Sequence, residues 1–248
     1  MAATYTSHGR GAPVTLVAHG LGATEGEARI PASGLPGTRV VLSLPSHGKA
    51  QDAPPDYWDY GRIAADVLEV ADEVQATRAV GVSLGAGALT RIAAEHPDRF
   101  ERLALLLPAS LDRPREVAAM WAFERLADAV AAAPSDGGAQ LRAAVAAEVP
   151  EGIEVGDHIE RRAEALLRLE PALRALPERS AVSDAAALAA VTSEVLVIGA
   201  TDDPMHPAEV AKAVAAAFGR SRLELLASPA PMLTHRRELR GMLVDFLR

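Results

Sequence analysis

Short apolar runs without apolar/polar alternation are the feature of this 248-residue chain that most restricts its fold. They recur at residues 14–18, 40–44, 79–82, 103–107, 195–198 and 223–226. Strands buried on both faces of a parallel sheet have this pattern, because neither side of the strand meets water. Helical patterns lie between them, at residues 60–74, 86–95, 208–218 and 237–247. The alternation of strand and helix predicts an α/β fold with a mostly parallel, doubly wound sheet and right-handed crossovers.

One long interval breaks this alternation. Between Pro108 and Glu194 the sequence is rich in Ala, Leu, Arg and Glu, is divided by prolines and glycines, and contains no convincing strand. Such an interval is too long for a loop without secondary structure. We therefore expect a helical cap insertion at residues 112–190 and a core formed by residues 1–111 and 191–248. A helical layer packed away from any functional site is the alternative.

Composition excludes several classes of protein. The formal net charge of -8 argues against a nucleic-acid surface, which needs clustered Lys and Arg. The absence of cysteine rules out disulfides, a thiolate nucleophile and a Cys-ligated metal. The N-terminal residues do not resemble a signal peptide, and the apolar stretches are too short to span a membrane. We expect a cytoplasmic protein that binds neither nucleic acid nor membranes; its oligomeric state is not predictable from the sequence.

A G-x-S-x-G segment, residues 81–85, lies between a predicted strand and a predicted helix. A serine in this context sits on a tight, strained turn, and its hydroxyl projects above the carboxyl end of the strand. Glycines at 81 and 85 remove Cβ atoms that would collide with the neighbouring strand and helix. The segment therefore indicates that Ser83 is a nucleophile, with an ordinary Gly-rich connection as the alternative. Dinucleotide binding needs the pattern G-x-G-x-x-G, and a P-loop needs a lysine after its glycines. These glycines are followed by neither the third glycine at the right spacing nor a lysine.

With these features the chain resembles the α/β-hydrolase superfamily, of the serine esterase or lactonase kind with a helical cap. Residues 19–22, His-Gly-Leu-Gly, are similar to the family's H-G-x-G turn, and residues 46–48, Ser-His-Gly, to its G-H-G loop. The resemblance implies that the backbone N–H groups of Leu21 and Leu84 form an oxyanion hole. It also implies that His19 orders the turn.

The resemblance further implies a base for Ser83, because an isolated hydroxyl is a poor nucleophile. His235 lies between the last predicted strand and the C-terminal helix, where the family's order of serine, acid and histidine puts the base. His206 lies too close in sequence to the expected acid to fit this order. We therefore predict His235 as the base.

The acid is expected shortly after the predicted strand at residues 195–198. Matching this segment to the family's strand-G-x-D-D-x-x-x-P pattern favours Asp203, whereas counting forward from Gly199 gives Asp202. Either aspartate could instead serve a turn or a helix cap. A metal site made by both aspartates and His206 is disfavoured, because nothing nearby completes a coordination shell.

The sequence thus predicts a serine hydrolase that cleaves a small or medium ester, lactone or thioester through Ser83, His235 and Asp203 and an acyl-enzyme. It predicts a small-molecule substrate and neither cofactor nor metal. The alternatives are use of the same triad for C–C bond hydrolysis, acyl transfer or a lyase or cyclase step, and a non-catalytic ligand-binding homologue. Bulky apolar cap residues either line an acyl pocket or pack within the cap: Met120, Trp121 and Phe123.

Overall fold

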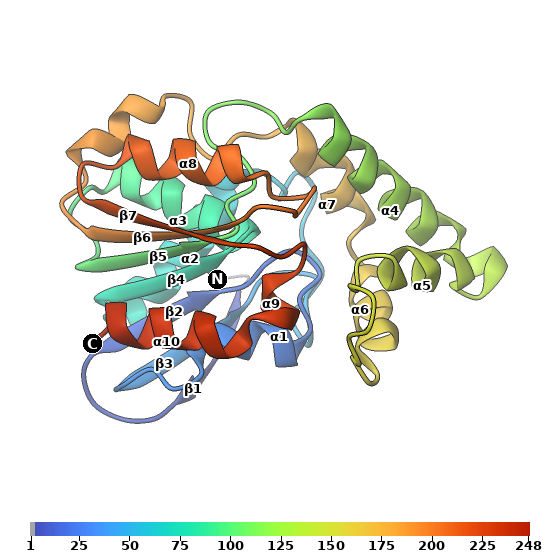
Figure 1. Cartoon of the computed structure of the whole chain (residues 1–248), viewed down its shortest axis with the longest axis horizontal. Coiled ribbons are helices and arrows are strands. Elements are labelled where there is room, and N and C mark those ends of the chain that lie inside the picture. The colour runs from blue at the N-terminus through green and yellow to red at the C-terminus, as the bar shows by residue number, and fades with distance from the viewer. Residues whose placement is uncertain (1–2) are drawn as a thin grey trace.

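The structure, a computed structural model, describes residues 3–248, and these residues form one seven-stranded sheet (Figure 1). The strand order is β1-β3-β2-β4-β5-β6-β7, and all pairs are parallel except β1 with β3. This confirms the predicted mostly parallel α/β sheet. The strands are β1 (Thr4–His8), β2 (Val14–Ala18), β3 (Thr38–Ser43), β4 (Arg78–Val82), β5 (Arg102–Leu106), β6 (Glu194–Ala200) and β7 (Ser221–Leu226).

β1 is the strand that the apolar runs did not predict. Its sequence is Thr-Tyr-Thr-Ser-His, and its side chains are exposed or half-buried. The reason is its position at one edge of the sheet, where only β3 pairs with it. An edge strand buries less of its surface than a central one, so a polar sequence is tolerated there and the run of apolar residues is missing.

Alternate side chains of the central strands enter two different apolar layers. In β2, Leu16 and Ala18 belong to one layer and Val17 belongs to the other, as the two-residue period of a strand requires. Each fully buried aliphatic side chain contributes about 1.5–3 kcal/mol relative to an exposed one.

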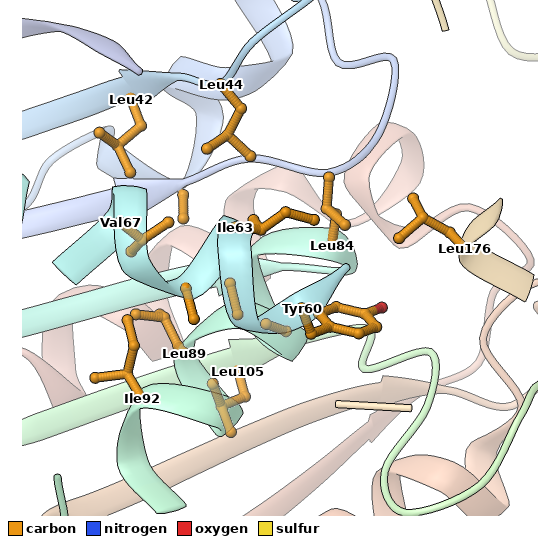
Figure 2. Packing of buried hydrophobic residues seen from close by; sticks show 14 of the residues in the cluster. Leu42, Leu44, Tyr60, Ile63, Val67, Leu84, Leu89, Ile92, Leu105 and Leu176 are labelled. Carbon is orange, nitrogen blue, oxygen red and sulfur yellow. The ribbon is translucent and has the colours of Figure 1, made fainter. Parts of the chain in front are cut away.

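Helices cover both faces of the sheet. The layer that contains Leu16 is closed by α2 (Tyr60–Glu73), α3 (Leu84–Glu95) and α8 (Ala208–Ala217). Figure 2 shows side chains of α2 and α3 packed together in this layer, with Leu42 and Leu105 of the sheet nearby. The layer that contains Val17 is closed by α1 (Glu25–Arg29), η1 (Ile30–Ala32) and α10 (Arg236–Phe246).

Between β5 and β6 the chain forms helices and no strand, as the sequence predicts. Figure 1 shows α4, α5 and α6 standing beyond one end of the sheet. The last helical turn, η3, instead packs against α3 and α8 of the core. The division of the chain at residues 112 and 190 stays a prediction. The helices are α4 (Val117–Asp136), α5 (Ala139–Ala146), α6 (His158–Leu166), α7 (Glu170–Ala175), η2 (Leu176–Glu178) and η3 (Ala185–Ala190).

The register of the central strands brings their carboxyl ends to one edge of the sheet. Val82 of β4 pairs with Leu106 of β5, which in turn pairs with Ile198 of β6. The segments that follow β2, β4 and β6 therefore emerge side by side, in the crevice where open α/β sheets bind ligands. None of the described helices has the length and apolar composition needed to cross a bilayer.

Candidate active site

Ser83 occupies the sharp turn between β4 and α3. Its backbone has φ 48° and ψ −100°, a conformation that L-residues adopt at a cost of about 1–3 kcal/mol. Two glycines permit this turn. A Cβ on Gly81 would lie 2.5 Å from the Gly85 backbone, and a Cβ on Gly85 would lie 2.2 Å from the carbonyl oxygen of Ala18. The G-x-S-x-G segment therefore has the tight strand-to-helix geometry predicted for it.

The imidazole beside Ser83 belongs to His206. The distance from Ser83 Oγ to His206 Nε2 is 2.8 Å, and His206 Nδ1 lies 2.7 Å from Asp203 Oδ2. With a proton on Nδ1 donated to the carboxylate, Nε2 is free to accept the serine hydroxyl proton. Three groups thus form a continuous hydrogen-bonded relay from carboxylate to hydroxyl.

The expectation that His235 lies beside Ser83 is wrong. His235 lies between α9 (Pro231–Thr234) and α10, and its Nδ1 lies 2.7 Å from Thr234 Oγ1. It does not line the cavity that contains Ser83. The expected chain order led to His235 because that order requires a histidine after the last strand, and it also led to the rejection of His206.

A tight turn explains why a histidine so close to the acid can reach the serine. Asp203 Oδ1 accepts hydrogen bonds from the N–H groups of Met205, at 2.8 Å, and His206, at 3.2 Å. The chain therefore folds back over the carboxylate within one turn, and the imidazole lies against Oδ2 of the same group. The spacing D-x-x-H directly after a buried strand is the sequence signal that could have indicated this pair.

The structure brings Asp203 rather than Asp202 to the imidazole. Asp203 is buried, whereas Asp202 is exposed and accepts a hydrogen bond from the Thr201 hydroxyl at 3.0 Å. Burial alone would raise the pKa of Asp203. The hydrogen bonds from His206 and from two backbone N–H groups outweigh burial and lower this pKa, so the carboxylate stays ionised at neutral pH.

The N–H groups of Leu21 and Leu84 have no acceptor among the residues that the structure describes. Leu84 is the first residue of α3, directly after the serine. The turn that contains Leu21 also lies close to the serine, because a Cβ on Gly20 would be 3.5 Å from the Ser83 Cβ. Both donors are therefore free and belong to turns next to the serine, and that of Leu84 lies at a helix N-terminus where negative charge is favoured. The oxyanion hole expected from the sequence stays a prediction.

Two buried histidines hold the turn at residues 19–22. His19 Nε2 accepts the N–H of Leu44 at 3.1 Å, and His47 Nε2 accepts the N–H of Gly22 at 2.9 Å. The Nδ1 atom of each ring lies 2.9 Å from a backbone carbonyl oxygen. Burial lowers the pKa of both imidazoles, so both are neutral at pH 7 with the proton on Nδ1.

Comparison with known proteins assigns the fold to a family. The sequence model of the alpha/beta hydrolase fold family matches residues 15–232. The chain belongs to the alpha/beta hydrolase fold family. This confirms the resemblance drawn from the serine turn and identifies the chain as an α/β-fold hydrolase. No match was found among curated proteins.

Solved structures of similar fold cover nearly the whole of this α/β hydrolase. A hydrolase from Pseudomonas aeruginosa PA01 superposes with a TM-score of 0.79 and 23% identity, covering 99% of this chain and 94% of that one. The enol-lactonase from Burkholderia xenovorans LB400 has a TM-score of 0.74 and 21% identity, with 99% and 96% covered. A thermophilic esterase from Thermogutta terrifontis has a TM-score of 0.73 and 19% identity, with 97% and 91% covered.

A cavity of about 810 Å³ opens above the serine of this α/β hydrolase. Its floor contains Ser83 and His206, and its walls come from both the core and the helices between β5 and β6. Of the bulky apolar residues on α4, Trp121 lines the cavity and Phe123 is buried under the Arg115 guanidinium. Packing among the helices therefore holds for Phe123, and the use of Trp121 in an acyl pocket stays a prediction.

The cavity of this α/β hydrolase also has a charged end. Glu27 of α1, His158 and Arg162 of α6, and Glu148 line it together with Arg125 of α4. Nowhere in residues 3–248 do three or more His, Asp or Glu side chains gather in an arrangement able to hold a metal ion.

Proposed function

We propose that this protein is a serine hydrolase that cleaves an ester-type carbonyl through Ser83, His206 and Asp203. The single observation that carries the proposal is the hydrogen-bonded relay from Asp203 through His206 to the Ser83 hydroxyl. Such a relay lets a weak nucleophile lose its proton as it attacks. His206 replaces the histidine that we predicted from the sequence.

The chemistry follows from the positions of these groups. His206 Nε2 accepts the proton from Ser83 Oγ as the oxygen forms a bond with the carbonyl carbon of the substrate. The carbonyl oxygen becomes an oxyanion, which accepts hydrogen bonds from the N–H groups of Leu21 and Leu84. The imidazolium then donates its proton to the leaving oxygen or sulfur, the bond to the leaving group breaks, and an acyl-enzyme remains.

Deacylation repeats these steps with water. His206 accepts a proton from a water molecule while the water oxygen attacks the acyl carbon. The tetrahedral intermediate collapses, the proton returns to Ser83 Oγ, and a carboxylic acid leaves. Asp203 stays ionised throughout and stabilises the imidazolium, which agrees with the lowered pKa of its carboxyl group.

Cavity size and lining favour a small or medium ester, lactone or thioester as substrate. A cavity of about 810 Å³ falls within the range of roughly 300–1,000 Å³ that is usual for small-molecule sites. Most of its lining residues near the serine are apolar, such as Val82, Leu107 and Met232. Similarity to proteins described as an enol-lactonase and an esterase supports the same substrate class. The cytoplasmic location expected from the sequence stays a prediction.

The proposal is tested with a fluorophosphonate probe and a panel of p-nitrophenyl esters, lactones and thioesters of graded acyl length. The wild-type protein is expected to be labelled at Ser83 and to hydrolyse members of the panel. Ser83→Ala is expected to lose labelling and to lower kcat by about 10⁶-fold while its circular dichroism spectrum is retained. A wild-type protein that is neither labelled nor active on any of these substrates would be a binding protein, and the proposal would be wrong.

A further inference from the structure

We infer that Arg162, a residue of the cap helix α6, is a positioning residue for the oxyanion hole, acting through the turn at residues 20–23. The inference rests on the proposed function, because it concerns the N–H of Leu21. It extends that function by giving the cap a role in rate as well as in substrate choice. The evidence is the hydrogen bond of the Arg162 guanidinium to Gly22 and the hydrogen bond within the turn to Gly20.

Arg162 joins the cap to this turn. Its Nη1 donates a hydrogen bond to the carbonyl oxygen of Gly22 at 3.2 Å, and its Nε lies 2.9 Å from Glu148 Oε2. Leu166, four residues later on the same face of α6, also packs on the turn, since a Cβ on Gly22 would lie 2.6 Å from its Cδ2 atom. The helix therefore rests directly on the backbone that follows the oxyanion donor.

Two planar peptides connect the contact between Arg162 and Gly22 to the N–H of Leu21. The carbonyl of Gly22 and the N–H of Ala23 belong to one peptide plane, and the Ala23 N–H donates to the carbonyl oxygen of Gly20 at 3.2 Å. The same oxygen lies 2.9 Å from Nδ1 of His19, so the core and the turn fix it together. The Gly20 carbonyl shares its own plane with the N–H of Leu21. Because N–H and C=O point in opposite directions across a trans peptide, fixing the Gly20 oxygen fixes the direction of the Leu21 N–H.

The turn is held from the core on its other side. His47 accepts the N–H of Gly22 at 2.9 Å, so the core and the cap each bind one polar group of this glycine. The guanidinium is mostly buried, and its burial is offset by Glu148 and by the nearby carboxylate of Glu27. Arg162 is therefore a fixed contact rather than a mobile surface side chain, and among the described residues it alone donates a hydrogen bond to the turn from the side of α6.

Arg168 offers a matched control. It follows α6, and its guanidinium also joins a carboxylate, Asp52 at 2.7 Å, to backbone carbonyls of a core loop, Gly48 at 3.2 Å and Ala50 at 2.8 Å. Loss of either arginine removes a cap-to-core contact of the same chemical kind. Arg162 binds the turn at residues 20–23 itself, whereas Arg168 binds the loop that carries His47 and reaches the turn only through that histidine.

The experiment compares wild type, Arg162→Met, Arg162→Lys and Arg168→Met. The double variant Arg162→Met with Glu148→Gln is added so that a charge left unpaired does not obscure the result. For p-nitrophenyl acetate, kcat of Arg162→Met and of the double variant is expected to fall roughly tenfold or more with KM within about twofold, because a misplaced oxyanion donor weakens transition-state binding selectively. The inhibition constant of a boronic acid, whose tetrahedral serine adduct occupies the oxyanion hole, is expected to rise by a similar factor.

Arg162→Lys keeps the charge opposite Glu148 and is expected to recover part of the lost kcat. Hydrogen exchange of the Gly22 and Ala23 amides gives a readout that does not depend on activity. Exchange of these amides is expected to be faster in Arg162→Met than in Arg168→Met. Arg168→Met is expected to lower Tm and to change kcat, inhibition and exchange much less than Arg162→Met does, because its contact reaches the turn only through His47.

Equal amide exchange in Arg162→Met and Arg168→Met would overturn the inference, as would a kcat that falls no further in the first than in the second. A wild-type protein without activity or fluorophosphonate labelling would instead refute the proposed function. In that case the exchange data would still decide whether Arg162 holds the turn.

Discussion

At the scale of single residues, Asp202 and Asp203 show how surroundings separate two identical side chains. Asp203 is buried, accepts hydrogen bonds from two backbone N–H groups and is hydrogen-bonded to the imidazole of His206. Asp202 is exposed, and among the described residues it accepts a hydrogen bond only from the hydroxyl of Thr201. The chemistry of the acid therefore follows from the turn, not from the residue type.

Exchange of each aspartate for asparagine tests this difference. Asp203→Asn is expected to lower kcat on an ester substrate by about 10⁴-fold, because an amide that donates to Nδ1 stabilises the wrong tautomer of the imidazole. Asp202→Asn is expected to stay within roughly twofold, as an exposed substitution usually does. Steady-state kinetics of both variants measure the effect, and the reverse order would mean that Asp202 orients the base.

At the scale of elements, the turn between β4 and α3 depends on the close approach of backbone segments. Gly85→Ala would drive a Cβ into the Ala18 carbonyl, 2.2 Å away, and we expect it to lower the free energy of unfolding by roughly 3 kcal/mol or more. Gly241 is also helical, is exposed, and has open space around its Cβ position.

Gly241→Ala is therefore the control, and it is expected to raise the free energy of unfolding by about 0.5–1 kcal/mol because alanine restricts the unfolded chain. Urea denaturation measures both variants. If the two substitutions changed stability in the same direction, the contact between α3 and β2 would not be as tight as the structure indicates.

The loop that carries His47 gives a prediction about pH. Burial lowers the pKa of His47 well below its ordinary value of 6.5, so the folded state binds a proton less readily than the unfolded state. The stability that this difference provides is fully present above pH 6.5 and is lost as the pH falls through lower values. The slope reaches up to about 1.4 kcal/mol per pH unit for one histidine.

His47→Gln is expected to reduce the loss of stability between pH 7 and pH 5, because the amide oxygen can accept the Gly22 N–H and does not titrate. Urea denaturation at several pH values measures the slope. His96→Gln is the control, since His96 is exposed and should leave the slope unchanged. An unchanged slope in His47→Gln would show that this histidine is not buried neutral.

At the scale of the whole molecule, the cavity is lined both by residues that follow the strands and by residues of α4 and α6, and α4 offers a matched pair of residues to test its role. Trp121 and Val117 are both 60% exposed, but only Trp121 lines the cavity. Trp121→Ala is expected to raise KM for p-nitrophenyl octanoate roughly 5- to 20-fold through loss of about 1–2 kcal/mol of apolar contact. KM for the acetate ester should stay within about twofold.

Val117→Ala is expected to leave KM for both esters near wild type. If the two variants behaved alike on the octanoate, the acyl chain would not lie under α4, and another wall of the cavity would select the substrate.

The apolar runs predicted β2 to β7. In β2 to β6 the run reflects burial, because the middle of each strand has lost its contact with water. β7 lies at the other edge of the sheet, and only its Leu226 is buried. The runs did not predict β1, whose polar residues pair at an edge. The glycines around Ser83 were equally predictable, since only a residue without Cβ fits there.

The base was not predicted, because the choice of His235 rested on the order of residues along the chain. What decides the partner of Ser83 is the direction in which the turn after β6 projects its side chains, and this depends on backbone hydrogen bonds to Asp203 that a motif does not encode. The contact of Arg162 with Gly22 joins residues 140 positions apart and had no sequence signal.

The most direct measurement is kcat/KM of His206→Gln and His235→Gln on one ester hydrolysed by the wild type. We predict a fall of roughly 10⁴-fold or more for His206→Gln, because the serine loses its proton acceptor, and a value within a few-fold of wild type for His235→Gln. A His206→Gln variant that kept near-wild-type activity while His235→Gln lost it would contradict the account.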